Sequence, residues 1–236
     1  VAYIATPDAG VMRINLQDLS ILSSWQSLGA DNLEAAPIAV DEDIIYFGLT
    51  GFGILLIDRH TSEIIDIWDA DGTSGLPDND VLSLHLDYYG GLIIGMEVPN
   101  SGGTSNQAMA RWDGSNWEYF ETDVPGGNND PFKINDIKSD ADGVVAATNR
   151  GVCTWTGWNI IQGNIYEWDE CVSPMNNSAR FSETFSVELV PLSSPLSENC
   201  CTRILAGHDE GASLINRNTG LTVVERWTAG DDTQRA

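Results

Sequence analysis

The sequence predicts an all-β protein built from repeated four-stranded antiparallel units, and three observations carry that prediction. Short apolar runs alternate with clusters of Gly, Asn, Asp, Ser and Pro along the 236 residues. A glycine recurs ahead of an apolar strand at a regular spacing, and an aromatic residue follows each of these glycines. No segment keeps an apolar period of 3.6 residues for more than two turns, so no long helix is expected.

Residues 73–123 contain the clearest unit and serve as the template for the others. Its four apolar runs are 81–86, 92–98, 109–112 and 117–121. The sequence Asp113-Gly114 between the last two runs is a strong signal for a tight hairpin. A meander of four strands in about 45 residues has the size of a propeller blade, provided that it recurs.

Two markers show that the unit recurs. The glycine marker is found at Gly10, Gly53, Gly103, Gly151 and Gly211, with spacings of 43, 50, 48 and 60 residues. These spacings are close to the period of propeller blades. The aromatic marker of the fourth strand is found at Trp25, Trp68, Trp117 or Phe120, Trp168 and Trp227. We interpret all five aromatic positions as core residues that pack one blade against the next.

The predicted fold is a β-propeller of about five four-stranded antiparallel blades in a single domain, residues 1–236. The blades span about 1–30, 36–68, 73–123, 131–170 and 183–228. The fourth strand of the fourth blade is expected at 160–168, and the first blade lacks a first strand. We expect a closed ring of about five blades, and the alternative is a fragment of a larger propeller.

The charge of the chain limits its partners. The formal net charge is −24, with 11 Lys and Arg against 35 Asp and Glu, and the lysines are Lys133 and Lys138. Such a surface repels nucleic-acid phosphates and anionic lipids, which argues against both. It suits cations, cationic ligands or a salty environment, and its plainest interpretation is a solvated acidic coat.

No apolar run reaches the roughly 18 residues of a membrane span, so membrane insertion is not expected. No signal-peptide pattern is present, and the opening without Met indicates a mature or trimmed segment.

Two stretches carry a family resemblance. SGLPDNDVLSLHLDYYGGLIIGM and MARWDGSNWEYFETD contain a Leu-Pro lead-in, a turn like D-x-x-G, an apolar second strand and an aromatic last strand. In these features the template unit resembles the repeat of two-component-regulator propellers. The segments ILLIDRHTSEIIDIW and SLINRNTGLTVVERW are similar to the quinoprotein-like repeat. The resemblance implies a propeller and, for the regulator type, an extracytoplasmic sensor or ligand-binding domain. It implies little about activity, because both repeats encode packing and turns.

The candidate ligand site is the propeller face formed by the loops between second and third strands and between consecutive blades. The candidate residues on this top face are Asp8, Phe52, Glu97, Asn100, Arg150, His208 and Asp209. Arg150 and His208 contrast with acidic surroundings, and we expect that loss of either weakens a ligand without unfolding the protein. The loop after Glu97 is the first place to look for a ligand. An unoccupied solvated rim is the alternative.

Calcium is the one cofactor that the sequence suggests. The candidate ligands are Asp69, Asp71, Asp78 and Asp80. Carboxylates at alternate positions before a glycine present hard oxygen atoms to Ca²⁺. The segment lacks the full spacing and the closing Glu of an EF-hand, and Asp and Gly also build ordinary turns. Ca²⁺ binding is therefore a hypothesis, and no other cofactor is expected.

Four cysteines, Cys153, Cys171, Cys200 and Cys201, permit two disulfides. Adjacent cysteines form a vicinal disulfide in some quinoprotein dehydrogenases, but those enzymes look like larger rings whose catalytic residues have no counterpart here. We favour separate bridges that join Cys153 or Cys171 to Cys200 or Cys201. Such bridges would tie down the long loops at 171–182 and 192–201.

No catalytic residue is predicted. The chain has no G-x-S-x-G elbow, and His60, His85 and His208 have no paired metal spacing and no evident nucleophile partner. His85 lies in a predicted inner strand, where a packed and hydrogen-bonded imidazole is expected.

The sequence therefore predicts an extracytoplasmic propeller, periplasmic or secreted, that binds a small molecule, a glycan or a protein without catalysis of its own. One alternative is a propeller enzyme, such as a hydrolase, a lyase or a quinoprotein-like oxidoreductase, that uses acidic residues of the top face. The other is a structural or assembly module that forms an oligomer through the open edge of its first blade.

Overall fold

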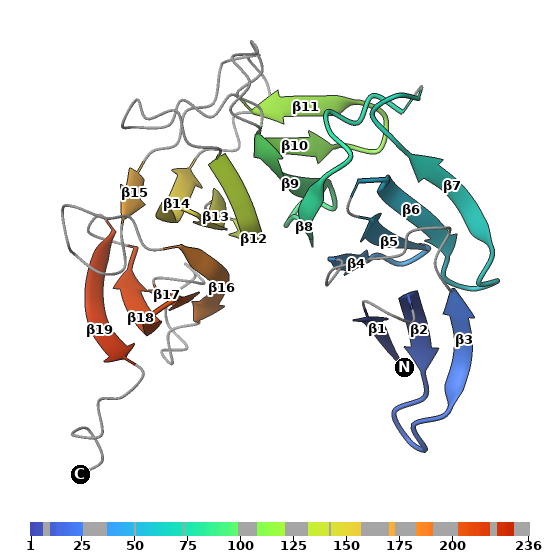
Figure 1. Cartoon of the computed structure of the whole chain (residues 1–236), viewed down its shortest axis with the longest axis horizontal. Helices are drawn as coiled ribbons and strands as arrows, with labels where there is room; N and C mark the ends of the chain where they lie inside the picture. Colours follow the sequence, from blue (N-terminus) through green and yellow to red (C-terminus); the bar gives the residue numbers. More distant parts are fainter. Residues whose placement is uncertain are drawn as a thin grey trace.

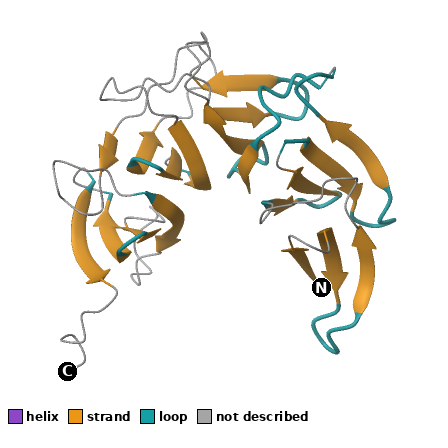
Figure 2. Cartoon of the chain, in the orientation of Figure 1, coloured by secondary structure: helices purple, strands orange, loops and turns teal. Residues whose placement is uncertain are grey.

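The described structure consists of β-strands joined by turns. The computed structural model describes residues 1–6, 10–25, 37–49, 51–72, 74–98, 108–120, 132–141, 143–156, 170–172, 183–190, 203–217 and 221–228. Every regular element in these ranges is a strand, and neighbouring strands of each sheet run antiparallel (Figure 2). The all-β prediction is confirmed.

The strands form five blades in chain order. Blade 1 consists of β1 (Ala2–Thr6), β2 (Gly10–Ile14) and β3 (Ile21–Trp25), and blade 2 of β4 (Ile38–Val40), β5 (Ile44–Leu49), β6 (Gly53–Asp58) and β7 (Ile64–Trp68). Blade 3 consists of β8 (Val81–Leu86), β9 (Leu92–Val98), β10 (Met109–Trp112) and β11 (Trp117–Phe120). Blade 4 consists of β12 (Phe132–Asp140), β13 (Gly143–Thr148), β14 (Gly151–Thr156) and β15 (Glu170–Val172). Blade 5 consists of β16 (Thr184–Val190), β17 (Arg203–His208), β18 (Gly211–Asn216) and β19 (Thr222–Thr228). Three strands are present in blade 1, as the sequence predicts.

Two features of blades 3 and 4 were not predicted from the sequence. In blade 4 the strand that pairs with β14 is Glu170–Val172, and the predicted range 160–168, with Trp168, lies outside the described residues. The end of β9 pairs with the start of β12, with Val98 opposite Phe132 and Glu97 opposite Lys133. This pairing joins blades 3 and 4 into one eight-stranded sheet.

The blades are arranged in an arc with the first strands of blades 2 to 5 toward its middle (Figure 1). Blades 1 and 5 lie at the two ends of the arc, on opposite sides of an opening. The expectation of a closed ring of about five blades is therefore wrong for the described structure.

The core consists of apolar layers between consecutive blades. Blade 2 is covered on both faces, because alternate side chains of a strand point to opposite sides of the sheet. Its residues Ile45 and Phe47 pack toward Val11 of blade 1, whereas Tyr46 and Trp68 pack toward blade 3. Burial on both faces explains why β5 and β6 are apolar at consecutive positions.

Several of the acidic residues fix turns. Four aspartates accept backbone N–H groups of the hairpin that follows them, and these are Asp41, Asp58, Asp87 and Asp113. The N–H groups of Asn116 and Ser115 donate to Asp113, which lowers the pKa of that carboxyl group. Part of the net charge of −24 thus belongs to the turn chemistry of the repeat.

A buried ion pair holds blade 3 together. The guanidinium Nε of Arg111, on β10, donates to Asp87, and both side chains are almost fully buried. The same carboxylate also accepts the N–H groups of Tyr89 and Gly91. A Cβ atom at Gly91 would come within 2.5 Å of the Arg111 guanidinium, so only glycine fits beside this pair. The D-x-x-G-like turn therefore links the first, second and third strands of the blade.

Candidate functional site

Turns between second and third strands form the predicted top face. Three of them are described: the turn with Phe52 between β5 and β6, the turn with Arg150 between β13 and β14, and the turn with Asp209 between β17 and β18. The corresponding turns of blades 1 and 3 contain Asp8 and Asn100, which lie outside the described residues. The repeated strand order places these turns at the same end of each blade.

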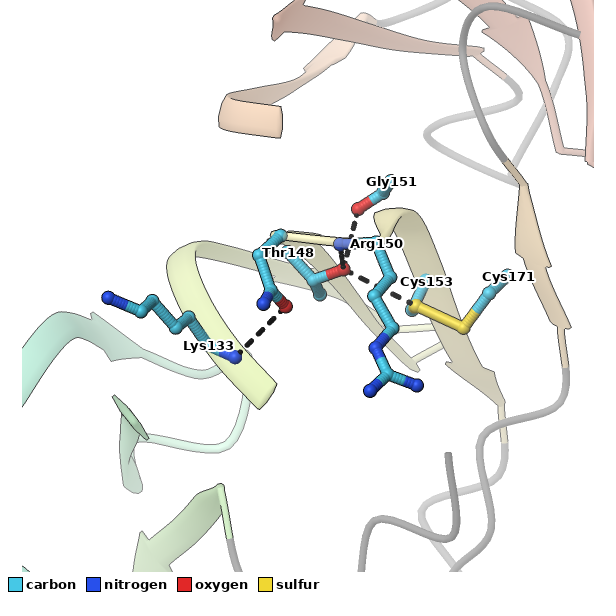
Figure 3. Close-up of a disulfide and its surroundings, with 7 residues drawn as sticks. Lys133, Thr148, Arg150, Gly151, Cys153 and Cys171 are labelled. Carbon is cyan, nitrogen blue, oxygen red and sulfur yellow. Dashed lines mark hydrogen bonds between the residues drawn. A yellow bond between two sulfur atoms is a disulfide. The ribbon is translucent and has the colours of Figure 1, made fainter. Parts of the chain in front are cut away.

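The turn after β13 is closed by its own side chains. Thr148 Oγ1 accepts the N–H of Arg150 at 3.0 Å and donates to the carbonyl oxygen of Gly151 at 2.9 Å (Figure 3). Gly151 has a φ of 109°, a region that favours glycine. Asn149 lies beside the start of β12, where its Oδ1 accepts the N–H of Lys133 at 3.1 Å. The turn is thus fastened to the strand that begins blade 4.

A charged pair stands at the junction of blades 3 and 4. Lys133 Nζ lies 2.8 Å from Glu97 Oε2, and about a third of each side chain is exposed. The hydrogen bond from Lys133 to Glu97 raises the pKa of the lysine. The pairing of β9 with β12 sets the two residues opposite each other. We call Glu97, Lys133 and Asn149 the rim cluster: the Lys133 ammonium group pairs with the Glu97 carboxylate, and the Asn149 side chain bonds to the backbone of Lys133.

Sequence reasoning singled out Glu97 but missed Lys133. Lys133 is one of two lysines in a chain with 35 acidic residues, and that rarity was the available signal. Its contact with Glu97 was not predictable, because it depends on a strand pairing between two blades.

Arg150 and His208 are buried, and their contact with a ligand stays a prediction. Arg150 is 9% exposed and His208 is 6% exposed. His208 Nδ1 accepts the N–H of Glu210 at 3.3 Å, and Nε2 donates to Ser213 Oγ at 3.0 Å. Both ring nitrogens are therefore used within blade 5. Substitution of either residue is expected to disturb the fold itself.

Phe52 and Asp209 remain accessible on the predicted face. Phe52 is 47% exposed at the tip of its turn, and about half of the Asp209 side chain is exposed beside His208. Neither residue is brought next to the rim cluster by a described contact. These two positions stay predictions for a ligand surface.

The acidic segment after β7 forms a turn. Asp78 Oδ1 accepts the N–H of Asp80 at 2.9 Å, and Asn79 Oδ1 accepts the N–H of Ala70 at 2.8 Å. Among the described residues, no group of three or more His, Cys, Asp or Glu side chains is placed to hold a metal ion, and Asp69, Asp71, Asp78 and Asp80 are within that set. Calcium binding here stays a prediction.

The disulfide joins Cys153 to Cys171, so the predicted pairing of either with Cys200 or Cys201 is wrong. The two residues lie opposite each other on β14 and β15, with their Cα atoms 4.1 Å apart (Figure 3). Adjacent strands bring their side chains within bridging distance, which the separation of 18 residues in sequence did not reveal. Cys200 and Cys201 lie outside the described residues.

His85 has the packed role that the sequence predicts. Its Nε2 accepts the N–H of Ser139 at 3.1 Å, across the junction of blades 3 and 4. Burial, together with the nearby charge of Lys138, lowers the pKa of His85 to about 4. The imidazole is neutral at physiological pH and serves as a link between β8 and β12.

No family model matches the sequence, and no curated protein matches it either. Solved structures are similar at low identity. The extracellular domain of the putative one component system BT4673 from B. thetaiotaomicron gives a TM-score of 0.63 at 16% identity, over 95% of this chain and 26% of that chain. The extracellular domain of the putative hybrid two component system BT3049 from B. thetaiotaomicron gives a TM-score of 0.52 at 13% identity, over 94% of this chain and 33% of that chain. The dihydro-heme d1 dehydrogenase NirN gives a TM-score of 0.57 at 11% identity, over 97% of this chain and 43% of that chain.

These likenesses show the class of fold, the β-propeller, and they agree with the predicted regulator-type blades. The chain spans about a quarter of the length of the BT4673 domain. Because the same fold also matches a dehydrogenase, the fold by itself does not decide the function. The described residues include no helix long and apolar enough to cross a membrane.

Proposed function

We propose that this chain is a sensor-like, extracytoplasmic binding module that takes up a ligand at the rim cluster and has no catalytic activity of its own. The Glu97–Lys133 pair is the observation that carries the proposal. It stands on the face that propellers commonly use, and part of both side chains is open to solvent. The structural likeness to the extracellular domains of BT4673 and BT3049 supports the sensor role.

The rim cluster has the chemistry of a recognition site. An ammonium group and a carboxylate held 2.8 Å apart can each exchange their mutual hydrogen bond for one to a ligand hydroxyl, amine or carboxylate. The Asn149 side chain and the turn behind it are fixed by hydrogen bonds, so little ordering is needed on binding. A small molecule, a glycan or a protein segment with polar groups fits this arrangement.

The histidines support a role without catalysis. His85 and His208 are committed to hydrogen bonds inside the blades. His60 is exposed and lies 3.3 Å from Asp43, with no described Ser or Cys nucleophile in contact. General-base chemistry needs a titrating group beside a reacting atom, and these three residues do not supply one within the described part of the chain.

A comparison of the two lysines tests the site. Lys133 and Lys138 lie on the same strand, and each is paired with a carboxylate, Glu97 and Asp136 respectively. Thermal-shift screening with neutral oligosaccharides, spermidine, amino acids and acidic sugars would first find a binding probe. Calorimetric titration of that probe is then expected to show an affinity at least about tenfold weaker for Lys133→Met and a nearly unchanged affinity for Lys138→Met. Equal affinities for the two variants would contradict the proposed site.

A further inference from the structure

Blade 5 has one covered face and one uncovered face. Its residues Val187, Ile204, Ala206 and Ile215 pack against blade 4. The opposite face carries large apolar side chains in contact with solvent: Phe185 at 51%, Leu205 at 38% and Trp227 at 44% exposure. We call Phe185, Leu205, Leu214 and Trp227 the terminal face. Exposed apolar side chains gathered on one sheet face mark an interaction surface more often than chance exposure.

The terminal face has the same construction as a blade-packing face inside the arc. Trp227 lies opposite Ala212, the first residue after Gly211, just as Trp68 lies opposite Ile54, the first residue after Gly53. At both glycines a Cβ atom would meet the carbonyl oxygen of the tryptophan, at 1.9 and 2.0 Å. The pair Leu205–Leu214 likewise corresponds to Tyr46–Leu56 of blade 2.

The equivalent face of blade 2 shows what such a surface packs against. Trp68 lies with its ring centroid 5.1 Å from Trp112 and 5.7 Å from Trp117, both on the next blade. Tyr46, Ile54 and Leu56 complete the same cluster. A tryptophan at this position therefore lies between two sheets wherever the arc provides a second one.

The other end of the arc offers the matching surface. Blade 1 packs toward blade 2 with Tyr3, Val11 and Trp25. The alternate positions face away, and we call them the leading face: Ala2, Ile4, Met12 and Ile14. By register these four residues correspond to Ile45, Phe47, Leu55 and Ile57, which form the face of blade 2 that covers blade 1. Ile4 is 38% exposed.

We propose that the terminal face binds the leading face of a second copy of this chain, head to tail. The contact continues the blade-to-blade interface that the arc already repeats. Glu188 of β16 stands where Ala39 stands in blade 2, and the structure leaves it exposed. The interface joins two different surfaces, so copies add in series and form a ring or a filament.

The charge of the chain predicts how this association depends on salt. Two copies with a formal net charge of −24 each repel one another. Added salt screens that repulsion, with a Debye length of about 10 Å at 0.1 M and about 3 Å at 1 M. Association is therefore expected to strengthen as NaCl is raised, which is opposite to the behaviour of an interface held by complementary charges.

Analytical ultracentrifugation of the full chain across protein concentration and NaCl tests the proposal. We expect a mass that rises with both. Trp227→Asp disables the terminal face and Ile4→Asp disables the leading face, so each variant alone should associate about 30-fold more weakly or worse. An equimolar mixture of the two variants should recover a dimer that grows no further, since each variant keeps the one face that the other lacks.

The matched control is Ile65→Asp, because Ile65 is also exposed, at 52%, but lies on β7 at the outer edge of blade 2. It should associate as the unsubstituted chain does, and circular dichroism should show all variants folded. A monomer at every concentration and salt would overturn the proposal and leave the terminal face to a further blade. A second outcome would also overturn the proposal: Trp227→Asp abolishes association, Ile4→Asp leaves it intact, and the mixture does not restore it. That outcome would mean that the terminal face binds the terminal face of another copy.

Discussion

Trp68 and Trp227 occupy the same place in two blades, and their surroundings differ. Each lies on a fourth strand, opposite the residue after a glycine with positive φ. Trp68 packs among Tyr46, Trp112 and Trp117, whereas Trp227 is 44% exposed. The interpretation of all five aromatic positions as core residues is therefore wrong for Trp227. A local sequence pattern sets which face a side chain belongs to, and a neighbouring sheet decides whether that face is buried.

Removal of Trp68 should have the largest effect on stability. Trp68→Ala empties the centre of the aromatic cluster between blades 2 and 3, and truncation of a packed tryptophan costs about 4 kcal/mol. Urea unfolding followed by circular dichroism measures this change. A loss of unfolding free energy below about 1 kcal/mol would mean that Trp68 contributes no more to stability than the exposed Trp227, and would contradict the contrast drawn between them.

Loss of the disulfide should come next. The double variant Cys153→Ala, Cys171→Ala releases β15 from β14, and closure of a loop of this length contributes about 3 kcal/mol. Blade 5 depends on blade 4 for its one covered face, so hydrogen exchange should speed up in β16–β19 as well as in β15. Faster exchange confined to β15 would show that blade 5 is stable without that support.

The imidazole of His85 should make the junction of blades 3 and 4 sensitive to acid. Its pKa is about 4 in the folded protein, below the ordinary value of about 6.5 in the unfolded chain. The unfolded state therefore binds more protons between these values, and the contribution of His85 to stability falls as pH drops from 6.5 toward 4. At pH 5 the loss relative to pH 7 is about 2 kcal/mol.

His85→Gln removes this acid-dependent loss. The unfolding free energy of the unsubstituted chain minus that of the variant, measured by urea titration, should be lower at pH 5 than at pH 7 by about 2 kcal/mol. Turn-capping carboxylates such as Asp58 and Asp113 are common to both proteins, so their titration cancels. A constant difference between the proteins would contradict the lowered pKa.

Removal of Trp227 should have the smallest effect. Trp227→Ala at low salt and low concentration, where copies stay apart, should change the unfolding free energy by less than about 0.5 kcal/mol. The same variant at high salt should lose more stability relative to the unsubstituted chain if a second copy covers Trp227 there. A large loss in dilute, low-salt solution would mean that Trp227 already has a packing partner within one chain.

Two predicted site residues, Arg150 and His208, are buried, and their burial could not be predicted from the sequence. Arg150 and His208 stand out because Arg, Lys and His are rare in this chain, and both lie at turns between second and third strands, as the sequence predicts. The direction of each side chain depends on neighbouring groups, such as Ser213 for His208, which no turn pattern reveals. Glu97 and Lys133 became neighbours through a strand pairing between blades, which no repeat pattern contains.

The sequence by itself determined most of the strands, the number of blades and the hairpin turns. Strand periodicity, positive-φ glycines and turn-capping aspartates are local properties, and each acts within a few residues of itself. The tertiary structure alone decided that the arc stays open, that Cys153 bonds to Cys171 and that Trp227 meets solvent. These outcomes depend on how one sheet packs against the next. That packing is set by contacts between residues that are far apart in the sequence.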